Sequence, residues 1–302
     1  FNRALTYPTE ITDISTTPTD LTDLSPIAWY RMGDNGSWKS PQWLLPNNEN
    51  KDKVSNYSFE FDGLDDRVQL SSDFVASGEF TVSFWMKPVS AGTPNGEIYP
   101  IGTFPGNENY IKLDQISVLW LRLGATTVIF NEAVYGAGAN NLVLNDWQNI
   151  VFIRDSSNVI RCYRNGVDFG YNVAAATNSN TLTLNSFGRI ISNSFGFEGG
   201  LDEIAFWNSD ETANLSTIYN GGEPTTLPSG AVAHYKMGEE ATFVYNVNPD
   251  GTWTIPDQVG SNDGTSNNQM ADSARVGTAP SSSNNALSFN MDLIDRVTDV
   301  PT

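Results

Sequence analysis

Short runs of alternating apolar and polar residues are the feature that most restricts the fold of this chain. From residue 57 onward these runs are separated by clusters of Gly, Asn, Asp and Pro, and no stretch keeps a helical period for more than about two turns. Residues 57–72 place four apolar side chains on one face across a turn: Phe59, Phe61, Val68 and Leu70. The pattern predicts an all-β fold.

Three further stretches refine this prediction. Residues 80–89 alternate but carry large side chains on both faces, which indicates a central strand covered on both sides. Residues 147–170 predict a hairpin, because a turn at 156–158 joins two alternating runs and an Asn-Gly pair at 165–166 supplies a second turn. Residues 210–222 are the best candidate for a short helix.

Charge and rare residues exclude several classes of function. The chain carries 35 Asp and Glu against 16 Lys and Arg, a net charge of -19, so its field repels nucleic acid and anionic lipid and attracts cations. Cys162 is the only cysteine and His234 the only histidine, which excludes an intrachain disulfide and a Cys/His zinc site. No stretch reaches the ~20 apolar residues of a membrane span, and no secretory leader is visible.

An internal repeat suggests how the chain is organised. The sequence "IAWYRMGDN" at 27–35 recurs as "VAHYKMGEE" at 232–240, and "SFEFDGLDDRV" at 58–68 recurs loosely as "SFNMDLIDRV" at 288–297. Each half of the chain therefore holds a similar opening segment.

The repeat divides the chain into three parts. We expect residues 1–24 to be the exit segment of a preceding unit or an N-terminal arm, and residues 25–222 to be one complete domain. Residues 229–302 are expected to be a partial second repeat or an extended C-terminal segment. Unpaired strand edges in such a part need cover, so we expect the arms to lie across the sandwich or a neighbouring subunit.

Four segments carry a resemblance to a known family. In chain order they are "FDGLDDRV", "FTVSFWMKP", "WQNIVFIRDSSNVIRCYRNGV" and "FEGGLDEIAFWN", and together they resemble the laminin G-like, concanavalin A-like jelly-roll family. The resemblance implies two antiparallel sheets packed into a sandwich, with binding at the rim or on the concave face. The fold class that we predict is therefore an all-β, two-sheet antiparallel jelly roll with extended N- and C-terminal arms.

A second resemblance concerns the end of the chain. Residues 252–276 and 284–302 are similar to C-terminal segments of virion-associated laminin G-like proteins of marine bacteriophages and related viruses. This resemblance implies a place in a virus particle.

Catalysis is not predicted. Glucanases that share the jelly roll carry a Glu-x-Asp-x-x-Glu pattern, and the nearest residues here, Glu198, Asp202 and Glu203, have a different spacing. The neighbours Asp202 and Glu203 are also expected to point to opposite faces of a strand. His234 occupies the repeat position that Trp29 holds in the first copy, which favours a packing role over a general base.

Calcium is the cofactor that the sequence best accommodates. Asp62, Asp65 and Asp66 lie in one turn, and hard divalent cations need several closely spaced oxygen ligands. The resemblance adds Asp202, on a strand that lies close to this turn in the family. The alternative is that the carboxylates of the turn accept hydrogen bonds from their own backbone.

Aromatic side chains are the candidates for binding a sugar ring by stacking. The candidate residues are Trp38, Trp43, Tyr99, Tyr110 and Trp120. The alternative for each is an ordinary place in the core of the sandwich. Trp38 and Trp43 lie in a stretch without alternation, which favours exposure.

Together these features predict a non-enzymatic virion structural protein, a capsid decoration or tail-fibre component, that binds host surface glycans. Its partners would be other virion or surface-array subunits, as a homo-oligomer or assembly component, and its location the extracellular virion. The alternative is a secreted or cell-surface bacterial adhesin repeat that binds polysaccharide. A jelly-roll glucanase is a third, disfavoured reading.

Overall fold

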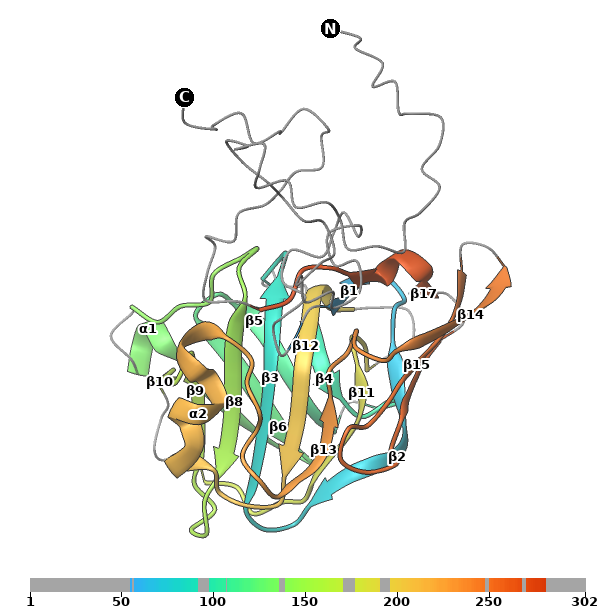
Figure 1. Ribbon diagram of the computed structural model, residues 1–302. Helices are drawn as coiled ribbons and strands as arrows, with labels where there is room; N and C mark the ends of the chain where they lie inside the picture. The colour runs from blue at the N-terminus through green and yellow to red at the C-terminus, as the bar shows by residue number, and fades with distance from the viewer. Residues whose placement is uncertain are drawn as a thin grey trace, which may run out of the picture. The chain divides into compact units, whose positions relative to one another are not determined.

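Two antiparallel sheets form the protein in the computed structural model, which describes Ser55 and residues 57–91, 98–106, 108–135, 139–170, 177–190, 196–247, 250–267 and 270–280 (Figure 1). Within these ranges, sheet A has the strand order β10-β9-β8-β3-β12-β1-β18, with β13 also paired to β12, and sheet B has the order β14-β15-β16-β2-β11-β4-β5-β6-β7, with β17 also paired to β15. The predicted all-β, two-sheet sandwich is confirmed. The predicted arms, residues 1–24 and the end of the chain after residue 280, lie outside the described residues.

The strands of sheet A are β1 (Ser58–Asp62), β3 (Phe80–Pro88), β8 (Gln148–Arg154), β9 (Ile160–Arg164), β10 (Val167–Asp168), β12 (Glu198–Trp207), β13 (Ala231–Tyr235) and β18 (Arg275–Val276). Those of sheet B are β2 (Val68–Ala76), β4 (Ile98–Gly102), β5 (Asn109–Gln115), β6 (Val118–Leu123), β7 (Thr126–Asn131), β11 (Leu182–Phe187), β14 (Thr242–Val247), β15 (Asp250–Ile255), β16 (Gly264–Ser266) and β17 (Met270–Ala271). The helical segments are α1 (Glu132–Tyr135), η3 (Thr212–Asn214), α2 (Leu215–Tyr219), η4 (Asn220–Gly222) and η5 (Asp272–Ala274).

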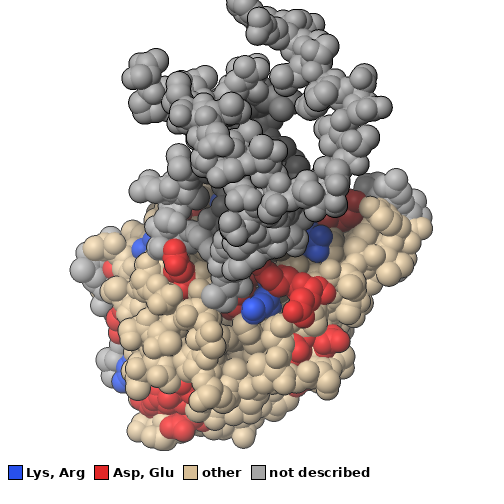
Figure 2. Space-filling model, in the orientation of Figure 1, with Lys and Arg blue, Asp and Glu red and all other residues tan. Residues whose placement is uncertain are grey.

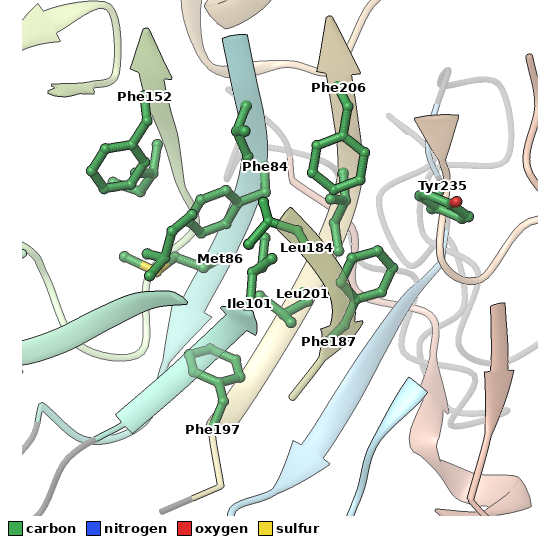
Figure 3. Packing of buried hydrophobic residues seen from close by; sticks show 14 of the residues in the cluster. Phe84, Met86, Ile101, Phe152, Leu184, Phe187, Phe197, Leu201, Phe206 and Tyr235 are labelled. Atoms are coloured by element: carbon green, nitrogen blue, oxygen red, sulfur yellow. The ribbon is translucent and has the colours of Figure 1, made fainter. Parts of the chain in front are cut away.

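The core lies between the two sheets. Figure 3 shows Phe84, Phe152 and Phe206 of sheet A packed with Leu184 and Phe187 of sheet B. The rings of Phe187 and Phe206 stack with their centroids 6.4 Å apart. Every second side chain of a strand points to the same face, and in these strands the side chains that point into the core are apolar. The alternating sequence pattern therefore predicted this core.

The central strand and the hairpin are confirmed. β3 lies between β8 and β12 and is buried on both faces along almost its whole length. β8 and β9 form the predicted hairpin, and the second predicted turn leads from β9 to β10. The two turns contain residues with positive φ, namely Asn158 at 62° and Asn165 at 51°. Asn adopts this left-handed region more readily than most residues, so the turns follow from the sequence.

The chain after residue 222 continues in the same two sheets. β12 is ten residues long, and β1 pairs only with its first part, Glu198–Leu201, so β13 pairs with the remainder. In sheet B, β16 pairs with β2, β15 pairs with β16, and β14 pairs with β15 at the edge of the sheet. The described part of residues 229–302, expected as a partial second unit, thus adds strands to the sandwich, because the end of β12 and the edge at β2 would otherwise be left unpaired.

The short helix predicted at 210–222 forms as η3, α2 and η4. It packs on the outer face of sheet A, where Ile218 contacts Val151 and Ile153 (Figure 1). Tyr219 stacks on Trp85 of β3 with a centroid distance of 6.0 Å. The large outward side chains of β3 and β8 are therefore covered by this segment.

Candidate functional site

The outer face of sheet B carries aromatic and cationic side chains. Along β5, Ile111 and Leu113 enter the core, and along β6, Leu119 and Leu121 do the same. Because side chains alternate, the residues between them face outward. The outward residues of these strands are Tyr110, Lys112, Asp114, Trp120 and Arg122.

Strand pairing brings these outward residues together. Tyr110 lies opposite Arg122, whose guanidinium carbon is 5.8 Å from the centre of the tyrosine ring. Lys112 lies opposite Trp120, with its Nζ 3.5 Å from the centre of the indole ring and 3.1 Å from Asp114. Cations over aromatic rings are attracted to the negative faces of the rings, so each pair holds its members in place.

Tyr99 of β4 extends this face. Its ring meets that of Tyr110 edge to face at 4.9 Å, and Ile190 packs with both. Gly102 makes this packing possible, because a Cβ there would lie 2.4 Å from Cγ2 of Ile190 and 2.9 Å from the carbonyl oxygen of Asn109. Three of the aromatic residues singled out in the sequence therefore share one sheet face.

These aromatic residues differ in their access to solvent. Tyr99 and Tyr110 are 3% and 5% exposed, whereas Trp120 and Arg122 are half-buried. The indole Nε1 of Trp120 has no hydrogen-bond partner in the described part of the chain. The face therefore offers one accessible indole surrounded by buried tyrosines, and the other two aromatic candidates, Trp38 and Trp43, lie outside the described residues.

Lys112 and Arg122 were missed in the sequence. Alternation alone places them on the same face of their strands as the aromatic candidates. The register that sets Lys112 beside Trp120 and Arg122 beside Tyr110 depends on tertiary pairing.

The turn between β1 and β2 gathers three carboxylates. Ligand oxygens of Asp62, Asp65 and Asp66 lie within 4.8 Å of one another. Asp62 Oδ1 accepts the N–H of Leu64 at 2.8 Å and of Asp65 at 3.2 Å, and Asp66 Oδ2 accepts the N–H of Asp62 at 3.0 Å. The oxygens fit the type and spacing that calcium requires, and the turn is also held by its own backbone donors. Calcium here stays a prediction.

Asp202 lies elsewhere on the molecule. Asp62 pairs with Glu198, four residues before Asp202 along β12, which is roughly 13 Å in a strand. Asp202 is fully buried, where it accepts hydrogen bonds from Ser55 Oγ at 2.6 Å and from the N–H of Glu203 at 2.8 Å. Burial, followed by the charges of Glu203 and Glu239, raises the pKa of Asp202 well above its usual range. The structure does not bring it to the acidic turn.

A β-bulge corrects the prediction that Asp202 and Glu203 point to opposite faces. Leu201 and Ile204 both enter the core, so the two residues between them lie on the outer side. The register of β12 against β3 shifts here, and Glu203 has a φ of 47°. An extra residue in one strand cancels the alternation locally.

The bulge joins Glu203 to the single histidine. Glu203 Oε2 lies 2.5 Å from Nε2 of His234 on β13, and the N–H of His234 donates to Asp257 Oδ1 at 3.0 Å. Asp202 and Glu203 are 0% and 2% exposed. His234 also lines a pocket of about 270 Å³, together with Thr226, Leu227, Pro228, Ser229, Gly230, Ala231 and Val259.

No helix in the described part of the chain is long and apolar enough to cross a membrane.

The two stacked antiparallel sheets form a sandwich of the jelly-roll class. In this sandwich the outer face of sheet A is covered by α2, and the outer face of sheet B carries the partly exposed Trp120. The family described as the concanavalin A-like lectin/glucanases superfamily matches residues 61–214, and the chain belongs to this family. The match ends before β13. The strand that pairs with the end of β12, and the strands that extend sheet B beyond β2, therefore lie outside the matched residues. No curated protein sequence matches the chain.

The chain is similar to several solved structures at low sequence identity. One is a protein from Bacteroides ovatus whose assignment as carbohydrate binding is provisional, with 15% identity, a TM-score of 0.50, and coverage of 76% of this chain and 62% of that one. The chain thus spans less than two thirds of that protein. A heptameric SAP-like pentraxin from Limulus polyphemus has 15% identity, a TM-score of 0.43, and coverage of 55% and 83%. Domain 4 of an extracellular arabinanase from Geobacillus stearothermophilus, in complex with arabinotriose, has 18% identity, a TM-score of 0.37, and coverage of 50% and 71%.

Proposed function

We propose that the protein binds carbohydrate through the outer face of sheet B and does not cleave it. The observation that carries the proposal is the convergence of Tyr99, Tyr110 and Trp120 on this one face, with the half-buried Arg122 beside Tyr110. Lys112, which is 2% exposed, holds the indole of Trp120 in place and is not a ligand contact. An aromatic ring buries the apolar face of a sugar, and neighbouring polar groups bind its hydroxyls. Trp120 is the contact residue in this proposal because it is the accessible ring.

The other outer face supports binding rather than hydrolysis. The family description names both lectins and glucanases, and a retaining glycosidase needs two carboxylates that reach the scissile bond. The two neighbouring carboxylates of β12, Asp202 and Glu203, are sealed from solvent and engaged with Ser55 and His234. A polysaccharide cannot reach them in this arrangement.

We extend the proposal to the setting of the protein. The resemblance of residues 252–276 and 284–302 to virion-associated proteins supports a non-enzymatic virion component, with other virion subunits as partners and a host surface glycan as ligand. A secreted or cell-surface adhesin that binds polysaccharide is equally compatible with the binding face. Immunogold labelling of purified particles and of cells separates the two: label on particles supports the virion, and label confined to cells overturns it.

Binding to neutral and acidic polysaccharides, measured by affinity electrophoresis and calorimetry, tests the binding face. Trp120→Ala is expected to weaken binding at least about tenfold, because truncating a central aromatic contact typically costs 2 kcal/mol or more. Tyr245→Ala is the matched control, since Tyr245 is an exposed aromatic residue of β14 at the opposite end of sheet B. Equal affinity of Trp120→Ala and the parent protein would overturn the proposal, and release of soluble sugar would favour the glucanase reading.

A further inference from the structure

Two arginines lie side by side where β2 begins and β11 ends. Val68 pairs with Phe187, so Arg67, just before β2, lies close to Arg189, just after β11. The chain as a whole has a net charge of -19, and the face drawn in Figure 2 carries several groups of acidic side chains with only scattered basic ones. A pair of neighbouring guanidinium groups is therefore unusual in this molecule.

Among the described residues, no carboxylate forms an ion pair with Arg67. Its guanidinium carbon lies 3.6 Å from the centre of the Phe104 ring, and its Nε is buried without a hydrogen-bond partner in the part of the chain that the structure describes. Burial, followed by the charge of Arg189, lowers the pKa of Arg67. Both effects oppose the positive charge, so an anion placed here would relieve both.

Gln69 adds an unused acceptor two residues along the same face of β2. Its Nε2 donates to the carbonyl oxygen of Asn185 at 2.9 Å, while its Oε1 is buried and has no partner among the described residues. Asn185 is in turn fixed by Asp73 and by the N–H of Phe104, at 2.8 Å each. Within the described residues, Arg67 Nε and Gln69 Oε1 are therefore two unpaired polar atoms of one ordered network, and the side chains that carry them are partly exposed.

The cluster is continuous with the aromatic face. Arg189 is followed directly by Ile190, whose side chain packs with Tyr99 and Tyr110. The guanidinium carbon of Arg122 lies 5.8 Å from the centre of the Tyr110 ring. Cations thus border this face from Arg67 to Arg122. Among the nearby acidic side chains, Asp114 pairs with Lys112, Asp73 accepts a hydrogen bond from Asn185, and Asp66, just before Arg67, accepts the N–H of Asp62.

We propose that Arg67, with Arg189 beside it, binds the acidic group of an anionic polysaccharide, a carboxylate or a sulfate, whose sugar rings lie on the face around Trp120. The inference rests on the proposed function and names the class of ligand. A guanidinium matches the geometry of a carboxylate or sulfate through two parallel N–H donors. A sugar hydroxyl supplies the donor that Gln69 Oε1 lacks, so the ligand carries both anionic and hydroxyl groups.

The test compares matched pairs of polymers. Dextran sulfate is compared with dextran, and polygalacturonate with its methyl ester, by calorimetry at a fixed salt concentration. We expect at least one acidic polymer to bind about tenfold or more tightly than its neutral partner, although the net charge of the protein repels both acidic polymers. The pair that shows the difference tells sulfate from carboxylate.

Variants of the arginine give the second readout. Arg67→Gln is expected to weaken binding of the acidic polymer about tenfold and to leave the neutral polymer unchanged, while Arg67→Lys retains part of the preference because it keeps the charge but not the planar donors. Lys87→Gln on sheet A changes the net charge by the same amount and serves as the control. Thermal melts of each variant confirm folding.

The outcomes separate the two proposals. Equal binding of acidic and neutral polymers, with Trp120→Ala still weakening both, overturns the acidic ligand and leaves carbohydrate binding standing. Unchanged binding by Arg67→Gln, or equally tight binding of single-stranded DNA, overturns the assignment to this cluster. Binding of no polymer at all overturns both.

Discussion

The two outer faces of the sandwich differ in what occupies them. On sheet A, α2 covers Val151 and Ile153 with Ile218, and the bulge in β12 keeps Asp202 and Glu203 buried. On sheet B, the corresponding face carries buried tyrosines, the buried Lys112, and the half-buried Trp120 and Arg122. A sandwich needs only one apolar face from each sheet, so the second faces are free to differ. One has become additional packing, and the other is the surface that we assign to a ligand.

The difference is already present in the strands. β3 and β8 are buried along both faces, with large residues at nearly every position. β6 alternates aliphatic residues toward the core with the half-buried Trp120 and Arg122 outward, whereas the outward Tyr110 and Lys112 of β5 are buried. A strand buried on both faces requires cover, whereas a strand such as β6 tolerates solvent on one side.

Removing the cover from sheet A should have the largest effect. Ile218→Ala is expected to lower the free energy of unfolding by about 2–5 kcal/mol, because it leaves a cavity against Val151 and Ile153. Ile129→Ala is the matched control on sheet B, where the side chain is 38% exposed, and is expected to cost less than about 0.5 kcal/mol. Urea unfolding measures both, and equal losses would show that the two faces are packed alike.

The acidic turn, which joins a strand of sheet A to a strand of sheet B, is the next test. If calcium binds there, a concentration of 100 times Kd adds about 2.7 kcal/mol to stability. Asp62→Asn should abolish this gain yet keep the turn, since its amide oxygen can still accept the N–H of Leu64. Thermal melts with calcium, with magnesium and with chelator measure it, and Asp146→Asn, an exposed change elsewhere, is the control. A melting temperature that calcium does not move excludes the ion.

The smallest expected effect is a pH dependence from the buried carboxyl of sheet A. The pKa of Asp202 is raised by burial and then by Glu203 and Glu239, so the folded state holds this proton more tightly than the unfolded state. Its contribution is complete below the unfolded pKa of about 3.9 and is lost as pH rises through the raised value. As the pH is raised from acidic to alkaline values, the free energy of unfolding of Asp202→Asn should therefore fall by less than that of the parent protein.

Urea midpoints across this pH range measure the divergence between Asp202→Asn and the parent. Glu60→Gln, at an exposed position of the neighbouring strand β1, should follow the parent curve. Parallel curves for Asp202→Asn and the parent would show that the buried carboxyl is not held protonated.

Much of the fold could be read from local patterns. The alternation of Phe59 and Phe61, the double-sided strand at 80–89 and the Asn-Gly turn at 165–166 each depend on residues a few positions apart. The end of the domain could not be read in this way, because β13 has the same alternation whether it pairs with β12 or begins another unit. The repeat left two interpretations of residues 229–302 open, a partial second repeat or an extended C-terminal segment, and in the structure β13 pairs with the end of β12.

For the candidate site, too, residue types could be predicted from the sequence, whereas the contacts between the residues could not. The aromatic candidates Tyr99, Tyr110 and Trp120 could be identified by type, and their convergence with Lys112 and Arg122 depends on the register of β4, β5 and β6. Asp202 was added to the acidic turn because of the family resemblance. The pairing of β1 with β12 sets Glu198 opposite Asp62, and Asp202 lies four residues further along β12.

By itself, the sequence determined an all-β sandwich, the central strand, the hairpin turns and the net negative charge, because these follow from the period of the side chains and from their composition. Only the tertiary structure decided which outer face is covered, that the bulge sets Asp202 and Glu203 on one side, and that Arg67 lies beside Arg189. Those features depend on which strands pair and in which register, and pairing is fixed by contacts between residues far apart in the chain.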